Sequence, residues 1–255
     1  MIDKRELLQK ARDKKLNLQI VEKDYVLGWL LYGLKDFDDL IFKGGTALSK
    51  IYFPEMWRLS EDLNFAFTGK SFNKIAERIE GALDKISKES HIKFKLKNKF
   101  TNPLYFQLKI GYSAIIGMNW IKVDATKENV MDTVNKKELQ RTYSDYPRYI
   151  VNVESLEEIF SEKIRSLIER TKCRDYFDVW KLCSMKYKKD RLKELFRKKC
   201  EIKKIEFECF EQIFPPDIRD TLLPYWEREL GRLASPLPDL DVVLKELRQK
   251  LSFLE

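Results

Sequence analysis

The spacing of apolar residues changes near residue 153, and this change limits the folds open to the chain. Before it, several runs alternate apolar and polar residues, as half-buried strands do, and helical stretches separate them. After it, apolar residues recur only at helical spacing. The pattern predicts an α+β domain with a mixed sheet over residues 1–153, not a doubly wound parallel one, and a helical domain over 154–255.

Local signals set the expected elements. Ser71 is a residue type that caps a helix, and Ser155 with Glu158 has the spacing of a capping box. His91 is expected to open a strand with a structural role. We expect helices over 2–14, 18–34, 47–52, 71–89, 155–171, 174–185 and from 239, and strands over 40–42, 62–68, 91–99, 104–113 and 118–125.

Charge points to an anionic partner. Lys and Arg number 49 against 41 Asp and Glu, a net charge of +8. The surplus lies in residues 161–205, which hold 16 basic and seven acidic residues. No apolar run reaches the roughly 18 residues that span a bilayer, and the N-terminus lacks the apolar core of a signal peptide. We therefore expect a cytoplasmic protein that does not use a membrane.

The supply of cysteine and histidine excludes several chemistries. The four cysteines form no C-x-x-C pair, which argues against a zinc site, and His91 is the single histidine. A histidine-based metal site or a Ser-His-Asp triad is therefore not expected. Carboxylates, lysines and metal ions with oxygen ligands remain.

One group of residues suits phosphate and metal chemistry. A short apolar strand ends at Lys43 and is followed by Gly44, Gly45 and Thr46, where the backbone could approach a phosphate closely. Asp62 and Asn64 stand two apart on the next strand, so they share a face and could hold Mg²⁺. A tight turn beside an exposed strand face is the alternative interpretation, and the residues alone leave the two nearly even.

Three further charged residues are candidates. Asp124 lies on the polar face of a later strand, where it could serve a metal or act as a general base, or merely face solvent. Lys163 falls inside the apolar arc of its helix, where it could serve an anion or, about equally, extend its ammonium to the surface. Glu162 and Arg165 fall where solvent-facing charges belong. Asp178 could pair with Lys163 or Arg174, or orient a nucleophile.

Together these segments resemble the AbiEii/AbiGii toxin family, within the DNA polymerase β-like nucleotidyltransferase superfamily. The match covers roughly residues 20–185 with gaps. The carriers are Glu22-Lys23-Asp24-Tyr25, the run from Phe42 to Lys50 with Gly-Gly-Thr at its centre, the run from Arg58 to Phe65, and Arg174-Asp175-Tyr176-Phe177-Asp178.

The resemblance implies a mixed sheet flanked by helices, a helical C-terminal domain, and Mg²⁺-dependent transfer of a nucleoside monophosphate from an NTP, with Mn²⁺ as a possible substitute. It further implies an RNA acceptor, the 3′ end of tRNA in characterised relatives, and a cognate antitoxin. The implied metal ligands are Asp62, Asn64 and Asp124, and the implied catalytic residues are Asp62, Asp124, Lys163 and Asp178. The implied nucleotide-binding residues are Gly44, Gly45, Thr46, Lys50, Arg58, Ser60 and Lys163.

RNA phosphates would meet lysines of the 91–99 strand and the basic helices. The expected contacts are Lys93, Lys95, Lys97, Arg170 and Arg174. Solvated surface is the alternative, because edge strands often carry lysine.

One residue departs from the family pattern. The family has an acid two positions after Asp62, and this chain has Asn64, which is neutral. We favour the interpretation that the protein is an enzyme with weakened or altered catalysis. The alternatives are an inactive nucleotide- or RNA-binding relative and transfer to a protein acceptor.

Overall fold

The computed structural model describes residues 1–54 and 57–255. The chain divides into two units, of which the first holds residues 1–130 and 134–154 and the second holds residues 131–133 and 155–255. Within the described residues, no helix combines the length and the apolar character that crossing a bilayer requires.

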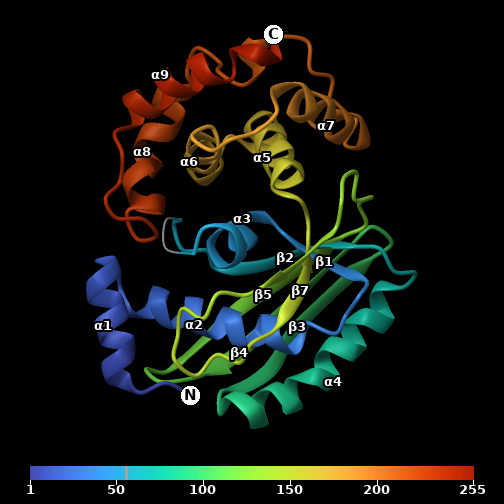
Figure 1. The fold of residues 1–255 in the computed structure, drawn as a ribbon, viewed down its shortest axis with the longest axis vertical. Helices are drawn as coiled ribbons and strands as arrows, with labels where there is room; N and C mark the ends of the chain where they lie inside the picture. The colour runs from blue at the N-terminus through green and yellow to red at the C-terminus, as the bar shows by residue number, and fades with distance from the viewer. Residues whose placement is uncertain (55–56) are drawn as a thin grey trace. The chain divides into compact units, whose positions relative to one another are not determined.

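The first unit is built on a mixed sheet, whose described strands lie in the order β3-β4-β5-β2-β1-β7-β6. Strand β2 pairs parallel with β5 and antiparallel with β1, and β1 pairs parallel with β7. The other neighbours are antiparallel. The predicted mixed sheet flanked by helices is therefore confirmed (Figure 1). The strands are β1 Leu40–Lys43, β2 Asp62–Phe67, β3 Lys93–Asn102, β4 Tyr105–Ser113, β5 Met118–Thr126, β6 Asn135–Glu138 and β7 Ile150–Val153.

Two helices cover the apolar face of this sheet. Helix α4 contacts β3 and β4, and α2 contacts β2 and β5. The ring of Phe72 in α4 lies 4.6 Å from that of Phe67 in β2 and 5.6 Å from that of Phe106 in β4, measured between centroids. The polar residues of the strands therefore point to the opposite face. The helical segments of this unit are α1 Lys4–Lys14, α2 Leu18–Gly33, α3 Gly44–Ala47, the π-helical turn η1 Leu48–Tyr52 and α4 Phe72–Ser90.

Side-chain caps set the helix starts, as predicted. The Ser71 hydroxyl accepts a bond from a first-turn N–H of α4, and the Ser155 hydroxyl accepts one from the N–H of Glu158 at 3.1 Å. The Glu158 side chain does more than a capping box requires. Its carboxylate accepts from the backbone N–H groups of Met131 and Asp132 at 2.7 and 3.0 Å, which attaches these residues to the second unit.

Strand β3 differs from its prediction in two ways. His91 does not open the strand; it ends α4 in the left-handed region, with φ +59°. A bulge between Leu96 and Asn98 interrupts the expected alternation, since an extra residue reverses the facing of those that follow. Lys99 consequently stands opposite Leu108, on the apolar side, and not with the other lysines of the strand.

A tyrosine-rich segment between β6 and β7 is anchored on α2. The hydroxyls of Tyr146 and Tyr149 donate to backbone carbonyls of α2 at 2.6 and 2.7 Å, and the Tyr143 hydroxyl lies 3.1 Å from the carbonyl oxygen of Val21. A Cβ at Gly28 would lie 2.2 Å from the Tyr146 oxygen, so only glycine allows this approach. Strands β6 and β7 on either side of this segment were not predicted, because each has only four residues and shows too little apolar–polar alternation.

The second unit is helical after Ser155. Its helices also bury charges that the sequence placed in solvent. Glu162 and Arg165 are buried, because α7 packs against α5 on that side. Lys199 of α7 is fully buried, and its ammonium lies 2.6 Å from Glu158 and 2.8 Å from Glu162. The helices are α5 Leu156–Arg170, α6 Cys173–Leu182, α7 Lys189–Ile202, α8 Ile218–Leu230 and α9 Leu240–Lys250, with short 3₁₀ turns Phe210–Gln212 and Ser252–Leu254.

The buried Lys199 predicts a large and local stability effect. Lys199→Met should lower the free energy of unfolding by about 3–5 kcal/mol, because two buried carboxylates lose their counter-ion. Lys198→Met is the matched control: this neighbour pairs with the exposed Glu194 at the surface, so its loss should have little effect. Urea unfolding followed by circular dichroism measures both. Equal stability of the two variants would contradict the structural role of Lys199.

Candidate active site

The pairing of β2 with β5 brings two carboxylates together. Asp62 stands opposite Lys122, and Asn64 stands opposite Asp124. Side chains at paired positions of neighbouring strands point to the same face. The sheet face opposite α2 and α4 therefore presents Asp62, Asn64 and Asp124 as neighbours, the three residues predicted as metal ligands.

The Gly-Gly turn lies directly beside these residues. Strand β1 ends at Lys43, opposite Asn64, and Gly44 follows with φ +75°, a conformation that favours glycine. A Cβ at Gly44 would lie only 3.4 Å from the Cβ of Asn64. The buried Thr46 hydroxyl donates to the backbone carbonyl of Asp62. The predicted phosphate turn, which includes Gly45, is thereby fixed against the carboxylate strand.

The two carboxylates influence one another. Burial raises the pKa of Asp62, the charge of Lys23 counteracts this rise, and the negative charge of Asp124 adds to it. The Tyr105 hydroxyl donates to Asp124 at 2.9 Å and itself accepts from Gln107 at 2.7 Å, which fixes the orientation of the Asp124 carboxylate. The site therefore concentrates negative charge in a half-buried position.

The donor set fits one divalent cation of the magnesium type. Within residues 1–54 and 57–255, no group of three or more histidine, cysteine, aspartate and glutamate side chains could hold a metal. The set on this sheet face is two carboxylates and the Asn64 amide, and Mg²⁺ prefers such oxygen ligands. A cation between Asp62 and Asp124 would also relieve the repulsion that contributes to the raised pKa of Asp62.

Three buried charges of α2 support the site. Glu22 accepts a bond from the N–H of Ile116 at 2.6 Å, in the turn between β4 and β5. The ammonium of Lys23 lies 3.6 Å from Glu61, the residue before Asp62. The Glu-Lys-Asp-Tyr motif in α2 therefore ties this helix to both strands that carry carboxylates.

Asp24, the third of these charged residues, binds Lys50. Asp24 lies 2.8 Å from the Lys50 ammonium and accepts the Tyr143 hydroxyl at 2.9 Å. Burial lowers the pKa of Lys50, and the charge of Asp24 opposes that shift. This environment supports a structural role, and nucleotide binding by Lys50 stays a prediction. Arg58 and Ser60, predicted for the same function, are buried, and Arg58 donates to the carbonyl of Leu59 at 3.1 Å.

In the second unit, Lys163 and Asp178 are direct partners. The Lys163 ammonium lies 2.8 Å from Asp178 and 2.9 Å from Asp175, and all three side chains are buried. The predicted pairing of Asp178 with Lys163 is therefore present. Arg170 closes the group with two bonds to Asp175, at 2.8 and 3.0 Å.

A comparison with protein families identifies the chain. The family described as nucleotidyl transferase AbiEii toxin, of type IV toxin–antitoxin systems, matches residues 29–251. The chain belongs to this family. It is thus a nucleotidyltransferase toxin, and its family implies a nucleotide substrate and a cognate antitoxin. None of the curated proteins matches the sequence significantly.

Solved structures agree with the AbiEii fold. The nucleotidyltransferase toxin MenT4 of Mycobacterium tuberculosis is similar with a TM-score of 0.79 at 16% identity, over 100% of this chain and 90% of that one. JHP933 of Helicobacter pylori is similar with a TM-score of 0.61 at 17% identity, over 94% and 93%. Identities this low show a shared fold alone.

The residues predicted to bind RNA differ in their solvent exposure and in their existing partners in this AbiEii toxin. Lys93, Lys95 and Lys97 are exposed on β3. Arg170 is already engaged by Asp175, and Arg174 is half-buried. The basic surplus of 161–205 also contains Lys163, Arg165 and Lys199, which are buried, so part of it neutralises internal acids.

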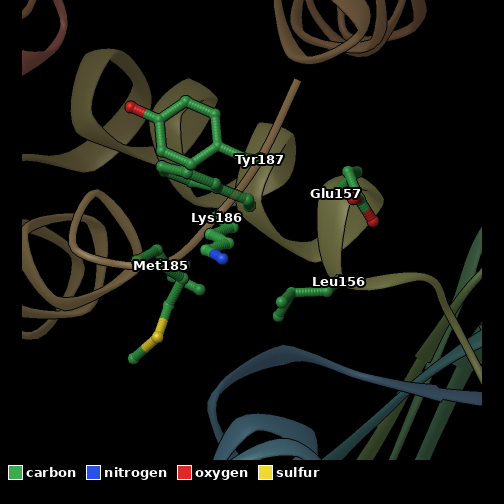
Figure 2. A pocket seen from close by; sticks show the side chains of 7 residues that line it. Leu156, Glu157, Met185, Lys186 and Tyr187 are labelled. Carbon is green, nitrogen blue, oxygen red and sulfur yellow. The ribbon is translucent and has the colours of Figure 1, made fainter. Parts of the chain in front are cut away.

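A small hollow in the second unit of the AbiEii toxin is too narrow for a ligand. It lies between α5 and the segment after α6, where Tyr187 stacks edge-on against Phe160 with ring centroids 5.1 Å apart (Figure 2). The hollow leaves no space for even a water molecule. We therefore assign it no function.

Sequence reasoning missed one buried pair at the glycine turn. The Lys43 ammonium lies 2.8 Å from Glu128, a buried acid just after β5. Lys43 shares its sheet face with Asn64. A lysine that closes an otherwise apolar four-residue strand was the available signal, whereas its partner, 85 residues later, gave none.

The Lys163 cluster predicts an acid-dependent loss of stability. Burial alone would raise the pKa of Asp175, but the charges of Lys163 and Arg170 outweigh it and hold that pKa well below its usual range. A depressed pKa in the folded state stabilises the protein above the unfolded aspartate pKa of about 3.9, and the contribution is lost as the pH falls below that value. Asp175→Asn should be less stable at pH 7 and should lose less stability between pH 5 and pH 2. Thermal unfolding across this range measures it, and parallel pH profiles would contradict it.

Proposed function

We propose that this AbiEii toxin transfers a nucleoside monophosphate from an NTP to an RNA acceptor, with the 3′ end of tRNA as the expected target and Mg²⁺ or Mn²⁺ as the metal. The observation that carries the proposal is the position of Asp62 and Asp124 on neighbouring parallel strands, beside the turn at Gly44. Family membership supplies the reaction class, and the site geometry supports its location.

The residues of the sheet face have separable tasks. Asp62, Asp124 and the Asn64 amide would hold the cation, which neutralises phosphate charge during in-line attack. The triphosphate would meet the backbone of Gly44 and Gly45, which carry no side chain that could keep it at a distance. The acceptor hydroxyl gives up its proton to a carboxylate of the site or to solvent, and its oxygen forms a bond to the α-phosphorus. The bond between the α-phosphorus and the bridging oxygen breaks, and pyrophosphate leaves.

Lys163 and Asp178 complete the proposal through the family resemblance. Their mutual ion pair supports a lysine held at a fixed orientation. Lys163 would contact nucleotide phosphate, and Asp178 would orient its ammonium. Arg58 and Ser60 follow from the same resemblance.

The carboxylate site predicts a sharp loss of transfer. Asp62→Asn should reduce the rate at least about a hundredfold, the magnitude typical of removing a key electrostatic group. Asp84→Asn, an exposed acid on the covered side of the sheet, is the matched control and should retain wild-type activity. The assay incubates each protein with radiolabelled NTPs, Mg²⁺ or Mn²⁺ and total tRNA, and counts label in RNA and in protein.

The same assay separates the alternatives. Label that accumulates in protein and not in RNA would replace RNA with a protein acceptor. Wild type that transfers no label but still retards RNA in a gel would favour the inactive binding relative. The neutral Asn64 is the observation behind that second possibility, because it removes one negative charge from the metal site.

Restoring that charge gives a further prediction. Asn64→Asp should lower the Mg²⁺ concentration needed for half-maximal transfer, since affinity for hard cations rises with the number of charged ligands. Asn73→Asp, an exposed position of α4 on the covered side of the sheet, controls for the general effect of added charge. A Mg²⁺ titration measures both variants. An unchanged or higher requirement in Asn64→Asp would show that Asn64 does not limit metal binding.

A further inference from the structure

Strand β5 carries an exposed indole next to the carboxylate site. Trp120 points to the same face as Lys122 and Asp124, because residues two apart in a strand share a face. Its side chain is 36% exposed. Trp120 lies about 7 Å along the strand from Lys122, which faces Asp62 across the pair.

The ammonium groups of three lysines lie over the Trp120 ring. The distances from the ring centroid are 4.3 Å to Lys109, 5.0 Å to Lys23 and 5.8 Å to Lys122. Lys23 is paired with Glu61. In the described part of the chain, Lys109 and Lys122 have no carboxylate oxygen within 4.0 Å.

A glycine extends this basic surface towards β3. Gly111 stands opposite both Trp120 and Lys95. A Cβ there would lie 2.5 Å from Cε of Lys97, so the stem of Lys97 crosses the place where a side chain would stand. The outer face of β3, β4 and β5 is consequently a lysine-rich surface with one indole in it.

We propose that Trp120 stacks on a nucleobase of the single-stranded RNA acceptor, while Lys109 and Lys122 bind the adjoining phosphates. Lys109 and Lys122 both lie over the Trp120 ring, so their ammonium groups repel one another, and a phosphate between them would relieve that repulsion. Once these flexible side chains turn from the ring to phosphates, the partly exposed indole offers a face on which a base can stack. An anionic peptide could form ion pairs with the lysines, but it would not account for the exposed indole among them. Lys122 stands opposite Asp62, so the RNA end that Lys122 would bind lies beside the proposed metal site.

This inference rests on the proposed function for the identity of the acceptor, yet its test needs no turnover. Fluorescence anisotropy of a labelled single-stranded RNA is measured without NTP or metal. Trp120→Ala should weaken binding about tenfold or more, and Trp120→Phe should weaken it less. Tyr225→Ala removes an exposed aromatic ring that also lies near a cation, and it should bind RNA like wild type.

Salt dependence separates stacking from charge. The double variant Lys109→Ala, Lys122→Ala should reduce the slope of log affinity against log salt by about 0.7 per lysine. Trp120→Ala should leave the slope unchanged. The double variant Lys85→Ala, Lys88→Ala changes exposed lysines of α4, on the other side of the sheet, and should keep the wild-type slope.

Several results would overturn the proposal. One is wild-type RNA affinity in a folded Trp120→Ala protein, with folding checked by thermal unfolding. Another is weakened NTP binding with unchanged RNA binding, which would assign the ring to the nucleotide. A third is an equal Trp120 dependence for polyglutamate. Asp62→Asn removes a negative charge opposite Lys122, so it should bind RNA at least as tightly as wild type while it loses transfer. A failure of transfer and a failure of this surface are therefore distinguishable.

Discussion

The parallel pairing of β2 with β5 is the constraint on which the first unit depends. Parallel neighbours need a crossover, and here it consists of α4, β3 and β4. The pairing sets Asn64 opposite Asp124, residues 60 positions apart in the sequence. A register slip of one residue would replace them with Leu63 or Val123, whose side chains belong to the buried face. The chemistry of the site is therefore as well determined as the apolar core.

Buried ion pairs hold the surroundings of this pairing in place. Asp24 with Lys50, Lys43 with Glu128, and Lys199 with two glutamates each connect separate elements within one unit. A buried pair adds little net stability over apolar packing, but a single member left alone is costly. Such pairs consequently favour one arrangement of the elements over its alternatives, which a site with a fixed geometry requires.

The sequence predicted local features such as helix caps and strand alternation, but it did not predict which distant strands pair. Ser71 and Ser155 capped helices where expected, and the alternation around Asp62 correctly gave the shared face with Asn64. The position of Asp124 beside Asn64 needed the strand order, which no local pattern contains. The bulge in β3 and the burial of Glu162 were not predicted for the same reason. Each depends on a neighbouring element, β4 for the bulge and α7 for Glu162. The role of Trp120 also emerged only when three elements placed lysines around it.

The order of charges along β5 bears on how the proposed metal site and the proposed RNA-binding surface would share one sheet face. Trp120, Lys122 and Asp124 follow one another on a single face, so an indole, an ammonium and a carboxylate stand in a row. Lys122 opposite Asp62 already offsets part of the negative charge, and Asn64 contributes none. In the proposed function, Asp62 and Asp124 would balance the charge of one divalent cation, and Lys122 would lessen the repulsion between these carboxylates and an approaching polyanion. An acid at position 64 would strengthen the hold on metal, yet it would also raise the electrostatic cost of bringing an RNA end and a triphosphate to the same strand face.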